Sequence, residues 1–264
     1  EIDDIDLKII DVAFICNDSS EHLNIASKLL KYDIDMFIEK PVDSSLEKLL
    51  NFKRDLLLKK SIVVVGYQTR FHPVYLKVKE ILGDLKNEVN YIEIKWGNYL
   101  PDFHKYEDYT KRYAGKANMG GGVLLTLSHE INILNSLISD NKIISSSIGK
   151  SKNFNLDVED FVIALLKSDN IHVSLILSFS QVYEERYIKI QTSDTYIIGD
   201  FVLNKVDIYK KNNKKKEYRF SLGRNELFTK EVDYFFKCID ERKVGFNTID
   251  ESIQDLKLIG ELKK

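Results

Sequence analysis

The sequence predicts an α/β protein with a parallel sheet in its first part and an antiparallel sheet with helices in its second part. Short, continuously apolar runs alternate with segments of helical pattern up to residue 66, which is the pattern of βαβ units. From residue 143 onward, several β-type segments follow one another with turn residues between them. This second pattern is typical of antiparallel strands.

The first part is predicted to contain three buried strands and two helices. The strands span 11–16, 34–38 and 62–66, and the helices span 21–32 and about 46–60. Each strand is an apolar run of the kind that is buried on both faces of a sheet. Residues 44–47 read Ser-Ser-Leu-Glu, which matches a capping box at the start of the second helix.

Polar residues follow each of these three strands. They are Asn17 and His22, Glu39 and Lys40, and Tyr67 and Gln68. The carboxyl ends of parallel strands line the crevice in which open α/β sheets bind their ligands. The sequence therefore predicts a site at this edge, although any parallel sheet has some polar residues there.

The second part begins with Arg70-Phe71-His72-Pro73, which enters a helix that runs to about residue 82. A strand at 88–99 and a long, aromatic-rich connection at 101–118 follow, and loops of that length are often functional. The remaining elements are predicted β segments at 143–149, 157–167, 171–180, 185–192, 196–201 and 206–210, and helices at 225–240 and 248–262. The basic run 210–216 is predicted to be a solvated hairpin tip.

A glycine-led segment, 119–134, lies within the second part. Three glycines, 120–122, precede a helix with apolar residues at 123, 124, 127, 131 and 134, which predicts one buried face. The glycines let a backbone or a ligand approach the helix start, where N–H groups favour a polar or anionic group. His129 is either a satisfied core histidine or a titratable group in a site.

Composition excludes several classes of function. The 264 residues carry a net charge of −2, 44% hydrophobic and 30% charged residues, which favours a globular protein and gives no overall attraction to nucleic acid or an anionic membrane. No apolar run reaches membrane-spanning length, no secretory leader is visible and no metal-ligand spacing occurs. Cys16 and Cys238 are expected to be reduced, buried thiols of a cytoplasmic protein.

Taken together, these motifs resemble the Gfo/Idh/MocA family of NAD(P)-dependent oxidoreductases. The matching residues, in the family's order, are His22 after the first strand, Glu39-Lys40-Pro41, Gly66 to Pro73, and Gly120-Gly121-Gly122 with His129. The resemblance implies the C-terminal part of a Rossmann-type dinucleotide-binding domain at 1–68. It also implies a substrate-binding and oligomerisation α/β domain at 69–264 with a large, open, mostly antiparallel sheet. No G-x-G-x-x-G occurs, so about 60 residues of the family's first half are expected to be absent from this sequence.

The resemblance also implies a reaction, a hydride transfer between NAD or NADP and a secondary alcohol or ketone of a sugar or nucleotide sugar. Lys40 matches the lysine that orients the substrate oxygen, and His129 matches the histidine that exchanges the hydroxyl proton. The expected cofactor-binding residues are Asn17, His22, Glu39, Lys40, Pro41, Gln68 and Arg70. The expected substrate-binding residues are Lys40, Arg70, Tyr99, His104, Tyr106 and His129. Helix capping remains an alternative for His22, as does packing for the aromatic loop residues.

The sequence departs from the family at two positions near His129. Thr126 stands where the family commonly has an acidic residue, and Asn132 stands where several relatives have aspartate. Glu130 is expected to point to a different side of the helix from His129. The alternative hypothesis is therefore a non-catalytic, sugar-binding or oligomerising remnant of the family. In either case we expect a homodimer or homotetramer formed through the open sheet face.

Overall fold

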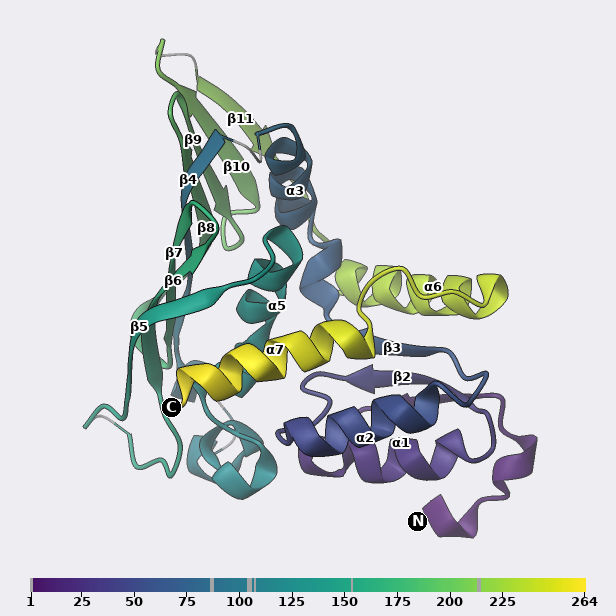
Figure 1. Ribbon diagram of the computed structural model, residues 1–264. Helices are drawn as coiled ribbons and strands as arrows, with labels where there is room; N and C mark the ends of the chain where they lie inside the picture. Colours follow the sequence, from purple (N-terminus) through teal and green to yellow (C-terminus); the bar gives the residue numbers. More distant parts are fainter. Residues whose placement is uncertain (1, 86–87, 104–105, 107, 153, 213–214) are drawn as a thin grey trace.

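A computed structural model of the chain describes residues 2–85, 88–103, 106, 108–152, 154–212 and 215–264. It contains a small parallel sheet and a large mixed sheet, with helices packed between them (Figure 1). The α/β fold predicted from the sequence is confirmed. Short 3₁₀ turns connect several of the helices and strands among the described residues. Those turns are η1 (Ile2–Asp4), η2 (Leu7–Ile9), η3 (Ser19–Glu21), η4 (Gln68–Phe71), η6 (Leu100–Asp102), η7 (Tyr109–Lys111), η8 (Tyr113–Gly115) and η9 (Ala117–Met119).

The small sheet has three parallel strands in the order β1-β2-β3. The strands are β1 (Val12–Ile15), β2 (Asp35–Glu39) and β3 (Val63–Gly66). Helices α1 (His22–Leu30) and α2 (Leu46–Leu56) cover one face, and α6 (Glu226–Glu241) covers the other (Figure 1). The predicted capping box at 44–47 is wrong, because the N-cap is Ser45 and its hydroxyl accepts from the Lys48 backbone N–H. Glu47 therefore lies one residue too early to reach back.

The large sheet has eight strands in the order β11-β10-β9-β8-β4-β7-β6-β5. Only β4 and β7 pair in parallel among these strands, and the other neighbours are antiparallel. The strands are β4 (Val89–Tyr99), β5 (Lys142–Gly149), β6 (Phe161–Ser168), β7 (Ile171–Ser178), β8 (Ser180–Thr192), β9 (Thr195–Asp200), β10 (Lys205–Lys210) and β11 (Lys215–Arg219). Helices α3 (Pro73–Leu85), α5 (Ser128–Leu137) and α7 (Ile249–Leu262) lie on one face (Figure 1).

Several strand predictions need correction. Strand β7 ends at Ser178 rather than at 180, and β8 begins at Ser180 rather than at 185. Strand β6 begins at Phe161 rather than at 157, because the backbone before it bonds elsewhere: the Glu159 carbonyl accepts from the Val123 N–H at 3.0 Å. The strand β11 was not predicted, since its sequence is almost entirely charged. It forms the predicted hairpin with β10. Part of the tip, residues 213–214, lies outside the described residues.

The glycine-led segment forms two short helices. Helix α4 (Val123–Thr126) ends at Leu127, whose backbone leaves the helical region, and α5 begins at Ser128. The prediction of a single buried face is wrong, because every residue from 123 to 134 is buried. The segment lies between the large sheet and α7 (Figure 1). Its polar residues are therefore inside the protein.

The glycines allow close backbone approaches, as predicted. Gly120 and Gly122 have φ angles of 77° and 102°, in the left-handed region that favours glycine. A Cβ on Gly121 would lie 2.2 Å from the Tyr113 carbonyl oxygen. The N–H groups at the helix start donate to protein carbonyls, including those of Ala114 and Glu159. Backbone carbonyl oxygens therefore accept from the N–H groups that were expected to favour a polar or anionic group.

Helix α6 attaches the C-terminal half of the chain to the parallel sheet. Its Phe235 is fully buried against Phe37 and Val64. Just after its end, Arg242 forms an ion pair with Asp35 of β2 at 2.6 Å. This packing closes the second face of the sheet and brings α6 residues to the carboxyl ends of the strands.

Replacement of Gly121 by alanine should destabilise the fold. The added methyl group would meet three backbone carbonyl oxygens within 2.8 Å, and backbone cannot move aside as a flexible side chain can. We expect a loss of about 3 kcal/mol in the free energy of unfolding, measured by urea denaturation. The matched control is Gly83→Ala in α3, where a Cβ meets nothing within 4 Å. It should be neutral or stabilising by up to about 1 kcal/mol. Equal effects of the two variants would contradict this assignment.

Candidate active site

The structure brings Lys40 and His129 to the same place. Lys40 directly follows β2, and its Nζ donates a hydrogen bond of 2.8 Å to the carbonyl oxygen of Thr126, which is 86 residues away in sequence. Thr126 ends α4, and His129 lies in the first turn of α5. The lysine is close enough for its charge to act on the imidazole. Lys40 and His129, which are far apart in the chain, are thus neighbours where the parallel sheet meets helices α4 and α5.

His129 is held in a buried, aromatic environment. Its ring centre lies 6.0 Å from that of Tyr67 and 6.5 Å from that of Trp96. Burial lowers its pKa well below the usual value, and the charges of Lys40 and Arg186 lower it further. At neutral pH the ring is therefore neutral, with one nitrogen that can accept a proton.

Lys40 is half-buried among charges of both signs. Burial lowers the pKa of its ammonium, the carboxylates of Glu39 and Glu130 raise it, and Arg186 lowers it. Glu39 also accepts a hydrogen bond of 3.1 Å from the Lys40 backbone N–H. Burial raises the pKa of Glu39, whereas Lys40 lowers it. The ionisation of Lys40 and the ionisation of Glu39 therefore depend on each other.

One turn of chain around His129 carries four buried polar atoms without a hydrogen-bond partner among the described residues. They are Thr126 Oγ1, Ser128 Oγ, His129 Nδ1 and Glu130 Oε2. Buried polar groups in proteins are almost always paired, and exceptions call for an explanation such as a ligand or water. The concentration of four such atoms beside Lys40 marks this turn as the strongest candidate for a binding and reaction site.

Sequence reasoning missed Arg186. Arg186 of β8 donates from Nε to Glu130 Oε1 at 2.6 Å, and the charge of Glu130 also acts on Lys40. Glu130 and His129 are consecutive residues of α5, and the expectation that they point to different sides of this helix stays a prediction. A signal for Arg186 was present: strand alternation places it on the same inward face as Ile188 and Ile190. A charged residue on that face needs a partner.

The other residues after β1 and β2 hold the strand ends together. His22 is 1% exposed, and its two ring nitrogens lie 3.0 Å from the Pro41 carbonyl oxygen and 2.8 Å from that of Asn17. The Lys40–Pro41 peptide bond is cis. The Asn17 side chain is exposed at the sheet edge. His22 therefore joins the loops, while Asn17 remains accessible.

The predicted residues of the second part are dispersed. Arg70 is buried, and its Nη1 donates to Asn132 and Glu251, both at 3.1 Å. These contacts belong to the α5–α7 interface, and none of those in the described part of the chain involves Lys40 or His129. Tyr99 packs on Phe154. Three predicted residues complete the set: Gln68 is half-buried in η4, Tyr106 is fully exposed, and His104 lies outside the described residues.

Helix α6 adds a carboxyl group to the strand-end crevice that the sequence did not reveal. Glu231 is 1% exposed, and burial, with the charge of Glu39, raises its pKa to about 9. Cys16 lies nearby, since both glutamates act on its thiol. Cys16 is exposed, so the expectation of two buried thiols is wrong for it, whereas Cys238 is buried. At neutral pH, Glu231 therefore carries its proton.

A hydrogen-bonded network behind His129 connects α5 and α7 with Tyr67, which directly follows β3. Asp255 of α7 is 1% exposed and accepts from the side-chain amides of Asn132 and Asn135 at 2.9 and 2.8 Å. It also interacts with the hydroxyl of Tyr67, whose ring packs on His129. Burial raises the pKa of Asp255 to about 6. The network fixes one wall of the site.

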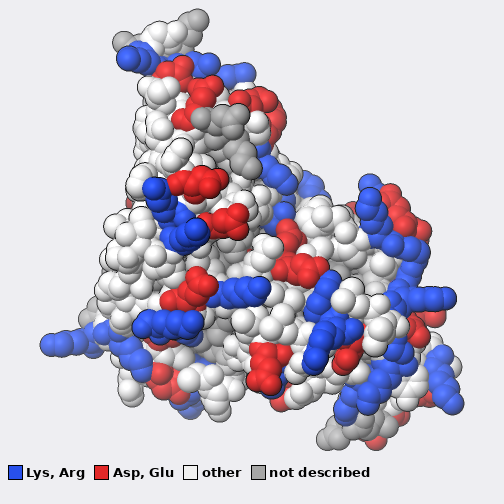
Figure 2. Space-filling view, in the orientation of Figure 1, with Lys and Arg blue, Asp and Glu red and all other residues white. Residues whose placement is uncertain are grey.

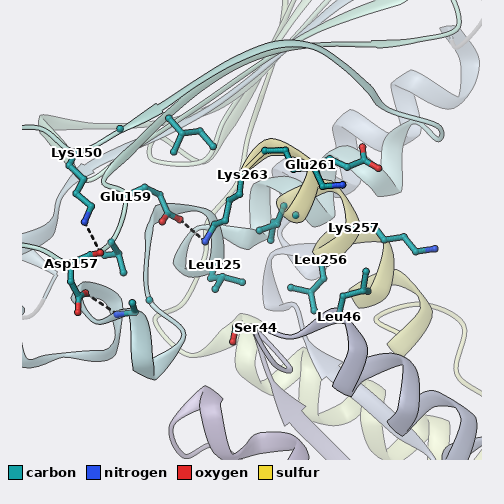
Figure 3. A pocket seen from close by; sticks show the side chains of 18 residues that line it. Ser44, Leu46, Leu125, Lys150, Asp157, Glu159, Leu256, Lys257, Glu261 and Lys263 are labelled. Atoms are coloured by element: carbon teal, nitrogen blue, oxygen red, sulfur yellow. Dashed lines mark hydrogen bonds and ion pairs between the residues drawn. The ribbon is translucent and has the colours of Figure 1, made fainter.

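A hollow of about 660 Å³ lies beside the C-terminal end of α7 and does not include Lys40 or His129 among its lining residues (Figure 3). Its basic residues already have protein partners in part: Lys150 donates to the Asp157 carbonyl at 2.7 Å, and Lys263 pairs with Glu159 at 3.3 Å. We therefore place the candidate site at the Lys40–His129 cluster, where four unpartnered buried polar atoms lie within one turn of chain.

The surface charge and the search for clusters of metal-ligating side chains do not change the choice of the candidate site. On the face shown in Figure 2, acidic and basic side chains are interspersed with uncharged ones, and neither sign covers it. Within the described ranges, no group of three or more His, Cys, Asp or Glu side chains is arranged to hold a metal ion. No described helix combines the length and apolar character needed to cross a bilayer.

Comparison with solved structures shows which proteins share this fold. Levoglucosan dehydrogenase, solved with NADH and levoglucosan, superposes with a TM-score of 0.87 at 14% identity, covering 99% of this chain and 79% of that one. The dehydrogenase MviM from Clostridium difficile gives 0.79 at 18% identity, with 100% and 81% covered. The UDP-N-acetylglucosamine 3-dehydrogenase GnnA from Acidithiobacillus ferrooxidans gives 0.78 at 16%, with 97% and 78% covered. No family model and no curated protein sequence matches.

The Asp255 network predicts a pH dependence of stability. The pKa of Asp255 is higher in the folded protein than the usual 3.8, so the folded state binds its proton more tightly than the unfolded state does. This contribution is fully present below about pH 4 and is lost as the pH rises to about 6, by about 3 kcal/mol. Asp255→Asn should remove this part of the pH dependence while weakening the network at pH 7.

The measurement is urea denaturation of wild type and variant at pH 4.5 and pH 7. Other buried carboxyl groups, Glu231 among them, titrate in both proteins, so the difference between the two profiles isolates Asp255. Parallel profiles would show that Asp255 does not titrate as the structure implies.

Proposed function

We propose that the chain is part of an NAD(P)-dependent oxidoreductase of the Gfo/Idh/MocA type that acts on a secondary alcohol or ketone of a sugar or nucleotide sugar. One observation carries the proposal: Lys40 and His129 meet beside a turn of unpartnered, buried polar atoms. The fold shared with sugar dehydrogenases, one of them solved with NADH and levoglucosan, supports it.

The two residues have complementary chemical roles. When an alcohol is oxidised, its hydroxyl proton passes to the neutral His129, and the carbon–oxygen double bond forms as the carbon loses a hydride. Lys40 donates a hydrogen bond to the same oxygen and stabilises the negative charge that develops on it. In the reverse direction, His129 returns the proton. The low pKa of His129 favours the neutral form that this role requires.

The edge of the parallel sheet fits a nicotinamide cofactor. The carboxyl ends of β1, β2 and β3 lie side by side, as the crevice of an open α/β sheet requires. Asn17 and Gln68 offer amide groups there, and the carboxyl group of Glu39 lies over Gly66, where a Cβ would be 3.1 Å from it. When bound, the nicotinamide accepts or donates the hydride. Asn17, Glu39 and Gln68 would orient it, and His22 and Pro41 would hold the loops that carry them.

The competing proposal is a non-catalytic, sugar-binding or oligomerising protein of the same fold. Thr126 favours it, because the acidic side chain that this family commonly has near the histidine is missing. A cofactor titration separates the two: the oxidoreductase binds NAD(H) or NADP(H), and the non-catalytic protein does not.

Substitution of either central residue should abolish most of the activity. In the natural protein that carries this sequence, Lys40→Met and His129→Gln should each lower kcat by at least about 100-fold. The assay follows nicotinamide absorbance at 340 nm with a panel of sugars, cyclitols and nucleotide sugars. Lys257→Met and His172→Gln, two exposed residues away from the site, are the matched controls and should retain activity. Unchanged turnover in the first pair, or a wild type that neither binds cofactor nor turns over any member of the panel, would refute the proposal.

We also propose a homodimer or homotetramer formed through the uncovered face of the large sheet. Alternate residues of β6 place Ile163 and Leu165 on that face, 50% and 48% exposed, and exposed apolar groups on a sheet favour association. Ile163→Lys combined with Leu165→Lys should lower the mass measured by sedimentation equilibrium. Leu57→Lys, 70% exposed next to α2, is the control. A monomeric wild type at high concentration would contradict the proposal.

A further inference from the structure

Glu130 is a second carboxylate of the site, and it is deeply buried. Its side chain is 1% exposed. Oε1 accepts from Arg186 Nε at 2.6 Å, whereas Oε2 is buried and has no hydrogen-bond partner among the described residues. Burial of a carboxylate is costly unless a charge nearby compensates for it. Besides Arg186, Lys40 is the positively charged group that lowers the pKa of Glu130.

Arg186 is held from three directions. Nε bonds to Glu130, Nη2 donates to Thr69 Oγ1 at 3.1 Å, and the guanidinium carbon lies 3.9 Å from the centre of the Trp96 ring. A guanidinium stacked on an aromatic face and bonded at its edge has little freedom to turn. Arg186 therefore fixes the direction of the Glu130 carboxylate.

Lys40 needs an anionic neighbour that stays in place. Thr126 supplies Lys40 with an uncharged carbonyl oxygen. Glu39 is one anionic neighbour, but one of its oxygens already accepts from the Lys40 backbone N–H. The charged and titratable groups acting on the ammonium are thus Glu39 of β2, Glu130 of α5 and Arg186 of β8, with His129 of α5 beside them.

We propose that Glu130 and Arg186 are positioning residues for Lys40. Glu130 supplies a buried countercharge that keeps the ammonium of Lys40 charged, and Arg186 holds the Glu130 carboxylate in place. This inference rests on the function proposed above and names two further residues of the same site.

The test measures the ionisation of Lys40 directly. Competitive labelling with isotopic acetic anhydride across a pH series, followed by peptide mass spectrometry, gives the pH midpoint at which each lysine becomes reactive. Loss of a nearby opposite charge lowers the pKa of an amine, and loss of a nearby like charge raises it. Glu130→Gln should therefore lower the Lys40 midpoint by about one pH unit or more. Arg186→Lys keeps the positive charge but loses the stacked, edge-bonded geometry that holds Glu130, so it should lower the midpoint too, by a smaller amount.

Recovery of the midpoint by a variant that conserves the charge separates positioning from a merely structural role, because a carboxylate alone would not reverse a general loosening of the fold. Glu130→Asp keeps the charge and should restore most of the wild-type midpoint. Lys257 within each sample, and Glu226→Gln on the outer surface of α6, are the controls and should not change. If Glu130→Gln does not fold, as judged by circular dichroism, Arg186→Lys decides the matter.

An unchanged Lys40 midpoint in the folded variants would overturn the inference. Because labelling requires neither cofactor nor substrate, its outcome is independent of activity. A shifted midpoint in a protein without oxidoreductase activity would refute the proposed function alone. Activity that depends on Lys40, together with an unmoved midpoint, would refute only the positioning role.

Discussion

The hydrogen bond between Lys40 Nζ and the Thr126 carbonyl joins the parallel sheet to the helices that pack on the large sheet. It places an ammonium group at a boundary where most of the surroundings are buried. Such a group is stable there only because carboxylates compensate for lost hydration. The arrangement of Glu39, Glu130 and Arg186 follows from that requirement. The candidate site is therefore a cluster of opposite charges that stabilise one another in a buried place, and not a single reactive side chain.

The C-terminal helices α6 and α7 also contribute to this site, although Lys40 and His129 come earlier in the chain. Helix α6 closes the parallel sheet and places Glu231 over the strand ends. Helix α7 supplies Asp255, which is linked through Tyr67 to the ring face of His129. Both contacts join segments more than 180 residues apart in sequence. The geometry of the site thus depends on the folding of the whole described chain.

The elements that could be predicted from the sequence are those whose pattern is set locally. The strand at 62–66 is continuously apolar, and the helix that begins at Pro73 has a proline where only a first turn accepts one. What could not be predicted depends on distant partners. The charged strand β11 is defined by pairing with β10. The partner of Glu130 lies 56 residues away in β8. The contacts of Arg186 with Glu130 and Trp96 therefore exist only in the folded chain.

The most direct test is a crystal structure of the natural protein with a nicotinamide cofactor and a bound sugar or cyclitol. The account predicts that one substrate oxygen lies within hydrogen-bond distance, about 3 Å, of both Lys40 Nζ and a ring nitrogen of His129. Glu130 should remain paired with Arg186 in that complex. A ligand bound elsewhere, for example in the hollow beside α7, with Lys40 still bonded only to Thr126, would contradict the account.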